Sequence, residues 1–346
     1  MGVRVAVAGA TGAVGREMLR TLAERQFPCD EIFALASAKS AGKELSYGDD
    51  KTVTVQSLDK FDFAQADIAL FSAGGDTSKA VAPTAGEAGC IVIDNSSAFR
   101  MDEDVPLIVP EVNPDAAKNC LKANGGRNII ANPNCSTAQL VVALKPLHDS
   151  YGVKRVIVST YQATSGAGAA GMDELFNQTK GVFVHDEIKP EKFTKQIAFN
   201  AIPHIDLFMD DGFTKEEWKM RAETKKIISE EIEVIAHCVR IPVFIGHSEA
   251  VFLRTIKETT REEVIDLLNN SSGIKVIDNP ESLKYPTPLE NANDTEDVFV
   301  GRIRSQTINS ENWTSMWIVA DNVYGKGAAL NTVQILEGLV ENNKLC

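Results

Sequence analysis

The sequence lacks the features typical of several classes of protein. Its 346 residues carry a net charge of −13 at pH 7, so no excess of positive charge favours nucleic acid or an anionic membrane surface. No apolar run is long enough to cross a bilayer. The six cysteines are scattered, without a Cys-x-x-Cys pair, as is usual in a reducing compartment. The sequence therefore predicts a cytoplasmic protein that binds neither nucleic acid nor membrane.

The sequence also lacks internal repeats and low-complexity tracts, and its first residues lead directly into a predicted strand, which argues against a signal peptide. A length of 346 residues with 44% hydrophobic residues is ample for two domains. We expect a first domain over residues 1–133, completed by a C-terminal helix within 325–346, and a second domain over 134–324.

Strand and helix patterns alternate over about the first 135 residues. A helix is predicted over Val14–Arg25, and strands are predicted at Val3–Ala8, Ile32–Ala36, Thr52–Gln56, Ile68–Ser72, Cys90–Asp94 and Asn128–Ala131. This alternation indicates an α/β fold with a doubly wound, mostly parallel sheet of Rossmann type. Ligands of such sheets bind at the carboxyl ends of the strands.

A glycine-rich loop, Gly9–Gly15, follows the first predicted strand with the pattern GxxGxxG. Its glycines allow backbone N–H groups to approach a pyrophosphate at the start of a helix, although many ordinary tight turns also carry glycines. We predict a dinucleotide site whose residues, including two at the end of another strand, are Gly9, Thr11, Gly12, Ala13, Val14, Ser72 and Gly74.

The second predicted strand favours NADP over NAD. An NAD site usually has an acidic residue here to bind the ribose 2′-hydroxyl. This chain instead has Ser37, Lys39 and Ser40, which suit a 2′-phosphate; the alternative is an ordinary polar turn.

Cys135 follows the last of these strands and precedes a helix predicted over Thr137–Leu147. A thiol at a helix N-terminus is surrounded by unpaired N–H groups and the positive end of the helix dipole, which favour the nucleophilic thiolate. The alternative is a small buried hydrophobic residue. The topology places Cys135 on the same edge of the sheet as the glycine loop.

The second domain is predicted to be α+β. A strand over Val153–Ala163 leads into a glycine-rich loop that is either a flexible connection or a second wall of the cofactor site. Arg240 and His247 lie on a β-rich run interrupted by proline and glycine, so both can reach one cleft from successive strands, although a lone histidine is more often structural. Gly327–Glu341 is expected to be an amphipathic helix that packs on the first domain.

Over nearly its whole length the sequence resembles the aspartate-β-semialdehyde dehydrogenase family. The resemblance rests on eight segments: Gly9–Gly15, Ala36–Lys43, Asp94–Arg100, Asn132–Gln139, Tyr161–Gly168, Glu216–Ile227, Arg240–Ala250 and the tail from Ala320. The chain departs from the family pattern in one extra residue between Asn322 and Gly327, and in Lys39 where many members have arginine.

The resemblance implies reversible, NADP-dependent reduction of L-4-aspartyl phosphate to L-aspartate 4-semialdehyde, with release of inorganic phosphate. The reaction belongs to lysine, threonine, methionine and isoleucine biosynthesis. The resemblance further implies that Cys135 forms a thioester, and that His247 takes the thiol proton and later returns a proton to the sulfur. Gln162 orients the substrate, and Asn134 contributes an oxyanion-stabilising wall.

For the substrate, the resemblance implies that Arg240 binds the α-carboxylate and Glu216 the ammonium, while Arg100 and Lys219 hold the phosphate. The alternative for Glu216 and Lys219 is a solvated ion pair on one helix. Ser165, Gly166 and Asn322 join the cofactor site, and no metal is expected. The implied assembly is a homodimer through the second-domain sheet, with a homotetramer as the alternative.

Three rival functions remain. An N-acetyl-glutamyl-phosphate reductase normally has glycine where this chain has Asn134. A malonyl-CoA reductase has no substrate ammonium for Glu216 to bind. A catalytically silent dinucleotide-binding or assembly protein would not need both Cys135 and His247.

Overall fold

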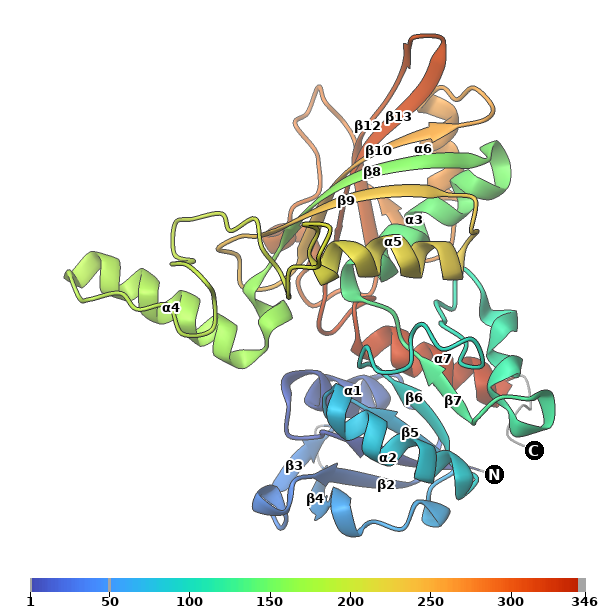
Figure 1. Cartoon of the computed structure of the whole chain (residues 1–346), viewed down its shortest axis with the longest axis vertical. Helices are drawn as coiled ribbons and strands as arrows, with labels where there is room; N and C mark the ends of the chain where they lie inside the picture. The colour runs from blue at the N-terminus through green and yellow to red at the C-terminus, as the bar shows by residue number, and fades with distance from the viewer. Residues whose placement is uncertain (1, 49–50, 342–346) are drawn as a thin grey trace. The chain divides into compact units, whose positions relative to one another are not determined.

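The computed structural model describes residues 2–48 and 51–341 and divides the chain into two compact units (Figure 1). Unit 1 comprises the described residues up to Asn134 together with those from Ala328 onward. Unit 2 is the continuous segment Cys135–Gly327. Among the described residues, no helix is both long enough and apolar enough to span a membrane.

Unit 1 contains a seven-stranded sheet in the order β3-β4-β2-β1-β5-β6-β7. All neighbouring strands are parallel except β3 and β4, which form an antiparallel hairpin at one edge. The predicted α/β class and mostly parallel sheet are therefore confirmed. The elements are β1 (Val3–Ala8), α1 (Ala13–Glu24), β2 (Cys29–Ala36), β3 (Glu44–Tyr47), β4 (Lys51–Ser57), β5 (Ile68–Phe71), α2 (Gly75–Glu87), β6 (Ile91–Asp94), β7 (Ile129–Ala131) and α7 (Ala329–Glu341).

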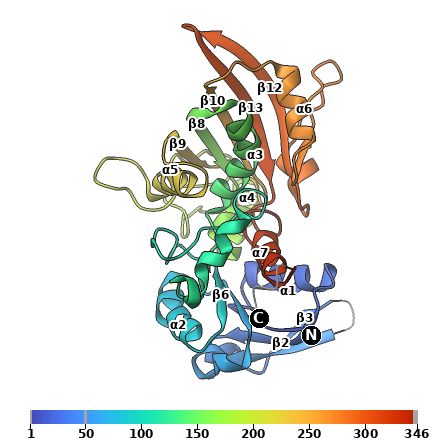
Figure 2. The ribbon, with the colours of Figure 1, turned by 90° about the vertical axis from the view of Figure 1, so that its right-hand side faces the viewer.

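Helix α7 completes the core of unit 1 although it comes almost 200 residues after β7. Its apolar stripe, including Val333 and Leu336, is buried in one cluster with Val5 of β1 and Met18 of α1. Figure 2 shows α1 and α7 side by side, and these helices are in contact. The expected packing of the C-terminal helix on the first domain is confirmed.

Unit 2 contains a six-stranded mixed sheet in the order β11-β12-β13-β10-β8-β9. Its helices include α3, which begins at Cys135, two residues before the predicted start. The elements are α3 (Cys135–Tyr151), β8 (Val153–Gln162), η6 (Thr164–Ala167), α4 (Ala169–Val184), α5 (Lys215–Ile227), β9 (Glu233–Arg240), β10 (His247–Thr255), α6 (Arg261–Asn269), β11 (Ile274–Val276), the π-helical turn η7 (Pro288–Ala292), β12 (Val298–Ile308) and β13 (Glu311–Ala320).

The two faces of the unit 2 sheet differ in burial. Helices α3, α5 and α6 pack on the sheet, and Val251 and Leu253 of β10 are fully buried. The intervening positions point to the other face, where Phe252, Ile157 and Ile235 are paired across β10, β8 and β9 and remain exposed. A row of large apolar side chains on an exposed face is typical of a protein–protein contact.

Candidate active site

Cys135 is the first residue of α3, so its thiol lies at the positive end of a 17-residue helix dipole. It is half-buried and not in a disulfide. The other described cysteines are less suited to react, because burial raises the pKa of Cys29 to about 11 and that of Cys90 to about 12. Burial also raises the pKa of Cys238, whose side chain is fully covered. Cys120 is fully buried too, so Cys135 is the described cysteine best placed to act as the predicted nucleophile.

Three further predicted site residues of unit 2 lie at the ends of three adjacent strands. Gln162 ends β8 and pairs with Arg240, the last residue of β9. His247 begins β10, whose next residue, Ser248, pairs with Tyr161 of β8. The run containing Arg240 and His247 is thus interrupted, and the two side chains come to one edge of the sheet from separate strands.

Arg240 is buried, and its Nη1 donates a 2.7 Å hydrogen bond to the carbonyl oxygen of Ala163. Burial lowers the pKa of Arg240, while the negative charges of Glu216 and of the Cys135 thiolate act in the opposite direction. The guanidinium therefore lies within electrostatic range of both an acidic side chain and the candidate nucleophile. This charge favours the thiolate form of Cys135.

The His247 imidazole is fully buried and held by the backbone. Its Nδ1 accepts a 3.0 Å hydrogen bond from the Ala163 N–H. Burial lowers the pKa of His247 well below its ordinary value, and the charge of Arg240 lowers it further. The ring is therefore neutral at pH 7. Because Nδ1 is the acceptor, the single proton of the neutral ring is on Nε2, which has no hydrogen-bond partner among the described residues.

Gly166 lies against both of these side chains. A Cβ atom at this position would come within 2.8 Å of Arg240 Nη1 and 3.3 Å of His247 Nε2. Asn322 fixes the neighbouring backbone, since its Oδ1 accepts hydrogen bonds from Ser165 Oγ at 2.9 Å and from the Gly246 N–H at 3.0 Å. The structure thus brings together three predicted cofactor residues of unit 2: Ser165, Gly166 and Asn322.

Helix α5 supplies a buried ionic cluster next to Gln162. Glu216 accepts a 3.2 Å hydrogen bond from Gln162 Nε2, and its other oxygen lies 3.1 Å from Lys219 Nζ. The side chains of Glu216 and Lys219 are only 6% and 13% exposed, so the alternative of a solvated pair is wrong.

Asp206 is a member of this cluster that the sequence did not predict. Its Oδ2 lies 2.7 Å from Lys219 Nζ. Burial alone would lower the pKa of Lys219, but Glu216 and Asp206 outweigh that effect and raise it. Lys219 is therefore a charged ammonium group shared by two carboxylates. Asp206 lies in a segment without periodicity and has a left-handed backbone, φ 68°, so no sequence pattern indicated its contact.

In unit 1, the glycine loop joins β1 to α1. Gly9 has a φ of +83°, and a Cβ atom there would overlap the backbone of Ser72, while one at Gly15 would overlap the backbone of Gly9. No side chain caps α1, and its first turn has no acidic residue. The backbone N–H groups at the start of α1 are therefore placed to donate hydrogen bonds to an anion. Thr11, Gly12, Ala13 and Val14 lie in this loop and the first helical turn.

Other predicted unit 1 residues follow the carboxyl ends of neighbouring strands. Ser37, Lys39 and Ser40 follow β2, and Ser72 and Gly74 follow β5, where Gly74 precedes α2 with a φ of +88°. Arg100 is buried, and its Nε and Nη2 donate to the carbonyl oxygens of Asn132 and Asn95 at 2.9 and 2.8 Å. Asn134 is also buried.

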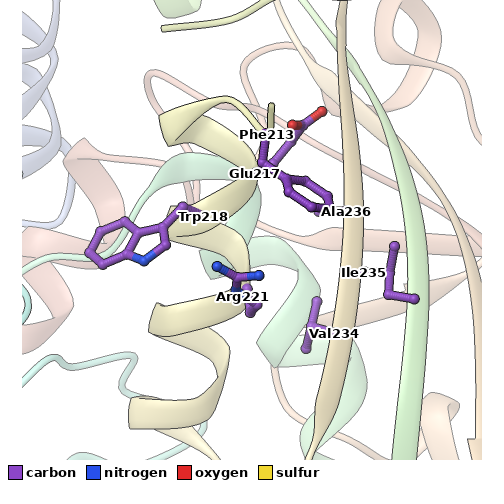
Figure 3. Close-up of a pocket in the computed structure, with 7 residues that line it drawn as sticks. All are labelled: Phe213, Glu217, Trp218, Arg221, Val234, Ile235 and Ala236. Atoms are coloured by element: carbon purple, nitrogen blue, oxygen red, sulfur yellow. The ribbon is translucent and has the colours of Figure 1, made fainter. Parts of the chain in front are cut away.

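A small pocket of about 50 Å³ lies between α5 and β9 (Figure 3). It contains none of the predicted site residues. Its lining residues are Phe213, Glu217, Trp218 and Arg221 on the α5 side and Val234, Ile235 and Ala236 of β9.

Comparisons with known proteins agree on one family. Residues 4–120 match the family model for the semialdehyde dehydrogenase NAD binding domain, and residues 144–324 match that for the semialdehyde dehydrogenase dimerisation domain. The chain is 56% identical to the aspartate-semialdehyde dehydrogenase of Aquifex aeolicus over 99% of both chains.

Solved structures extend this agreement. The crystal structure of aspartate semialdehyde dehydrogenase II from Vibrio cholerae matches with a TM-score of 0.94 and 50% identity over 99% of both chains. The Candida albicans aspartate semialdehyde dehydrogenase, solved with NADP, matches with a TM-score of 0.75 and 28% identity over 99% of both chains. The chain therefore belongs to the aspartate-semialdehyde dehydrogenase family of oxidoreductases.

Proposed function

We propose that the protein catalyses the reversible, NADP-dependent reduction of L-4-aspartyl phosphate to L-aspartate 4-semialdehyde through a thioester on Cys135. The observation that carries this proposal is the position of Cys135 at the start of α3, within electrostatic range of Arg240. Family membership supports the reaction and its place in amino-acid biosynthesis. A Vibrio cholerae relative was solved complexed with ASA.

The covalent steps need no base to activate Cys135. The thiolate sulfur attacks the acyl carbon of L-4-aspartyl phosphate, the acyl C–O bond breaks, and phosphate leaves. Bound NADPH supplies a hydride to the carbonyl carbon of the resulting thioester. When the C–S bond breaks, the aldehyde is released and the thiolate is restored. The reduction consumes one proton overall, and the released phosphate takes up this proton.

His247 has a narrower role in this scheme than the resemblance implied. The Ala163 N–H occupies the Nδ1 lone pair, and Nε2 already carries the proton of the neutral ring. Neutral His247 therefore has no free lone pair with which to take the thiol proton. We assign it as a hydrogen-bond donor, through Nε2, to the oxyanion that develops on the substrate carbonyl oxygen.

The contacts of Glu216 favour a substrate that carries an ammonium group. Glu216 is buried beside Gln162 at the strand ends, and Arg240 supplies a fork-shaped cation for the α-carboxylate. A malonyl thioester would leave Glu216 without a cationic substrate partner. Arg100 and Lys219 are proposed to bind the phosphate.

The glycine loop fits a dinucleotide, because side chains at Gly9 and Gly15 would overlap backbone atoms and α1 has no side-chain cap. We propose that Ser37, Lys39 and Ser40 bind the 2′-phosphate, since the turn after β2 has no acidic residue. Lys39→Glu should raise the KM for NADP at least about tenfold while changing the KM for NAD little. Lys43→Glu, a nearby lysine without an assigned role, is the control. Equal changes for both cofactors would place the 2′-phosphate site elsewhere.

We propose a cytoplasmic homodimer, with a homotetramer as the alternative. The matched dimerisation-domain model and the exposed row of Ile157, Ile235 and Phe252 support self-association through the unit 2 sheet. The free thiols of the five described cysteines suit a reducing compartment.

The decisive assay is oxidation of aspartate semialdehyde by the purified protein. We expect NADP reduction that requires inorganic phosphate. Cys135→Ser should lose several orders of magnitude in kcat and remain folded, because a serine alkoxide forms far less readily than a thiolate. Cys238→Ser is the matched control and should retain activity. Near-native turnover by the Cys135→Ser variant, or wild-type activity independent of phosphate, would contradict the mechanism.

A further inference from the structure

A second row of polar side chains lies beside the predicted catalytic row on the unit 2 sheet. This second row consists of Cys238, Thr160 and Glu249. Each lies two positions along its strand from a residue of the first row, namely Arg240, Gln162 and His247, respectively. These three pair directly across the sheet, Glu249 with Thr160 and Thr160 with Cys238. Residues two apart on a strand point to the same face, so the second row lies one pleat from the catalytic row.

Helix α3 repeats this two-layer arrangement. Gln139 follows Cys135 by four residues, which places it one turn further along the same side of the helix. Helix α3 packs against β8 and β10, and Gln139 is 1% exposed. Gln139 thus lies one layer from Cys135 on α3, and Glu249 lies one layer from His247 on β10.

Glu249 is unusual for its position. The next inward-facing residues of β10, Val251 and Leu253, are apolar and fully buried, as expected for a core strand. Glu249 is equally buried, and burial raises its pKa well above the ordinary value. The side chain of Gln139 opposes this rise, which indicates that the amide lies close to the carboxyl group. Neither carboxyl oxygen of Glu249, and neither amide atom of Gln139, has a partner with ordinary hydrogen-bond length and angle among the described residues.

We propose that Glu249 and Gln139 form a buried acid–amide pair that positions β10 against α3, and thereby positions His247 relative to Cys135. This inference rests on the roles proposed above for His247 and Cys135. When the two side chains pair, a protonated carboxyl group donates to the Gln139 amide oxygen, and the amide N–H donates to the carboxyl oxygen. Such a pair is directional, and a buried polar pair whose hydrogen bonds are satisfied makes the surrounding core more rigid. The Gln162 Nε2–Thr160 Oγ1 hydrogen bond, 3.3 Å long, links the two rows at the neighbouring strand.

The test compares five variants: Gln139→Leu, Gln139→Glu, Glu249→Leu, Glu249→Gln and the exchange variant Gln139→Glu/Glu249→Gln. Both leucine variants should lower kcat about tenfold or more, with the KM for phosphate changed less than about twofold, because misplacement of reacting groups acts on turnover. Glu249→Gln should stay within about threefold of the wild-type kcat, since two amides still pair. The exchange variant restores one acid and one amide, and should recover most of the activity lost in Gln139→Glu.

The rate of Cys135 alkylation by iodoacetamide gives a readout that needs no substrate. The leucine variants should change this rate, and the exchange variant should restore it. Val251→Ala, which removes methyl groups from the same face of β10, is the control: it should lower the unfolding temperature without changing the alkylation rate or kcat.

Leucine variants with wild-type kcat would overturn the proposal. So would an activity loss that follows loss of folded protein and is not recovered in the exchange variant. A wild-type protein that alkylates at Cys135 but lacks phosphate-dependent activity would contradict the proposed function alone, and the alkylation series would still decide the positioning role.

Discussion

Among single residues, we predict that Asp206 weakens the proposed binding of phosphate at Lys219. It shares the Lys219 ammonium with Glu216, so a phosphate that approaches Lys219 meets two carboxylates. Asp206→Asn removes a negative charge whose Oδ2 lies 2.7 Å from the ammonium nitrogen. This change should lower the KM for phosphate about fivefold, with a smaller change in kcat. Asp210→Asn, in the same exposed segment, is the control. A KM for phosphate that rises in Asp206→Asn would show that Asp206 orders Lys219 rather than competing for it.

Glu249 should also make stability depend on pH in a defined direction. Burial raises its pKa in the folded state above the ordinary 4.5, so the folded protein retains a proton that the unfolded chain has released. The stabilising contribution of this group is complete below that unfolded pKa and is lost as pH rises toward the folded pKa.

The Glu249→Gln variant has no titratable group at position 249, so it serves as the reference for this effect. Between pH 5 and pH 8, the free energy of urea unfolding of the wild type minus that of Glu249→Gln should fall by up to about 1.4 kcal/mol per pH unit. A difference that rises with pH would mean that Glu249 is ionised and favourably paired in the folded protein.

Some site residues could be predicted from the sequence and others could not. Cys135, Arg240 and His247 stand at the ends of helices or strands, where apolar patterns and glycine or proline mark the boundary. Asp206 lies in a segment without a pattern, and Glu249 interrupts an apolar strand pattern, so their contacts depend on packing that the sequence does not display.

At the scale of elements, we expect the local stability of α5 to affect the proposed substrate site. Thr214 and Glu217 form a capping box at its start, with hydrogen bonds of 3.4 and 2.7 Å, and the first two turns carry Glu216 and Lys219. Thr214→Ala should cost about 1 kcal/mol of stability. It should also raise the KM for semialdehyde and for phosphate more than it lowers kcat, because the binding residues lie in the turn that frays.

Thr260→Ala is the matched control, because Thr260 and Glu263 form the same capping box on α6, which carries no predicted site residue. This variant should lose a similar amount of stability and leave both KM values unchanged. Equal kinetic changes in the two variants would indicate a general loss of folded protein.

Most elements of unit 1 were predictable because parallel strands are apolar along their whole length, as in Ile68–Phe71. Two elements were not predicted. One is β3, a four-residue edge strand, Glu44–Tyr47, with two exposed positions and no apolar run. The other is α2, Gly75–Glu87, which contains a proline and little apolar periodicity. In unit 2, the sequence did not predict β12, whose second half carries several polar residues and is largely exposed.

At the scale of the whole molecule, α7 is essential to unit 1. Its buried residues Leu330, Val333, Leu336 and Leu339 together represent several kcal/mol of hydrophobic stabilisation, which is comparable with the net stability of a domain. A chain ended after Lys326 should therefore lose the cooperative unfolding transition of unit 1 and become sensitive to proteases there.

Glu337→Gln is the control for this truncation. It removes only the partly exposed ion pair with Arg25, 2.8 Å long, and should change stability by less than about 1 kcal/mol. The measurement is limited proteolysis with mass spectrometry, together with NADP binding. A truncated chain that keeps unit 1 protected and binds NADP with unchanged affinity would contradict this prediction.

The division of unit 1 into two stretches of sequence has a consequence during synthesis on the ribosome. Val5 and Met18 are synthesised before more than 300 further residues. Leu336, which packs in the same cluster, is synthesised only after that interval. Unit 2 emerges as one uninterrupted segment within that interval. The nascent chain thus has an enforced order, in which the first part to leave the exit tunnel is the last to become complete. During this delay its apolar surface is available to chaperones and to neighbouring nascent chains.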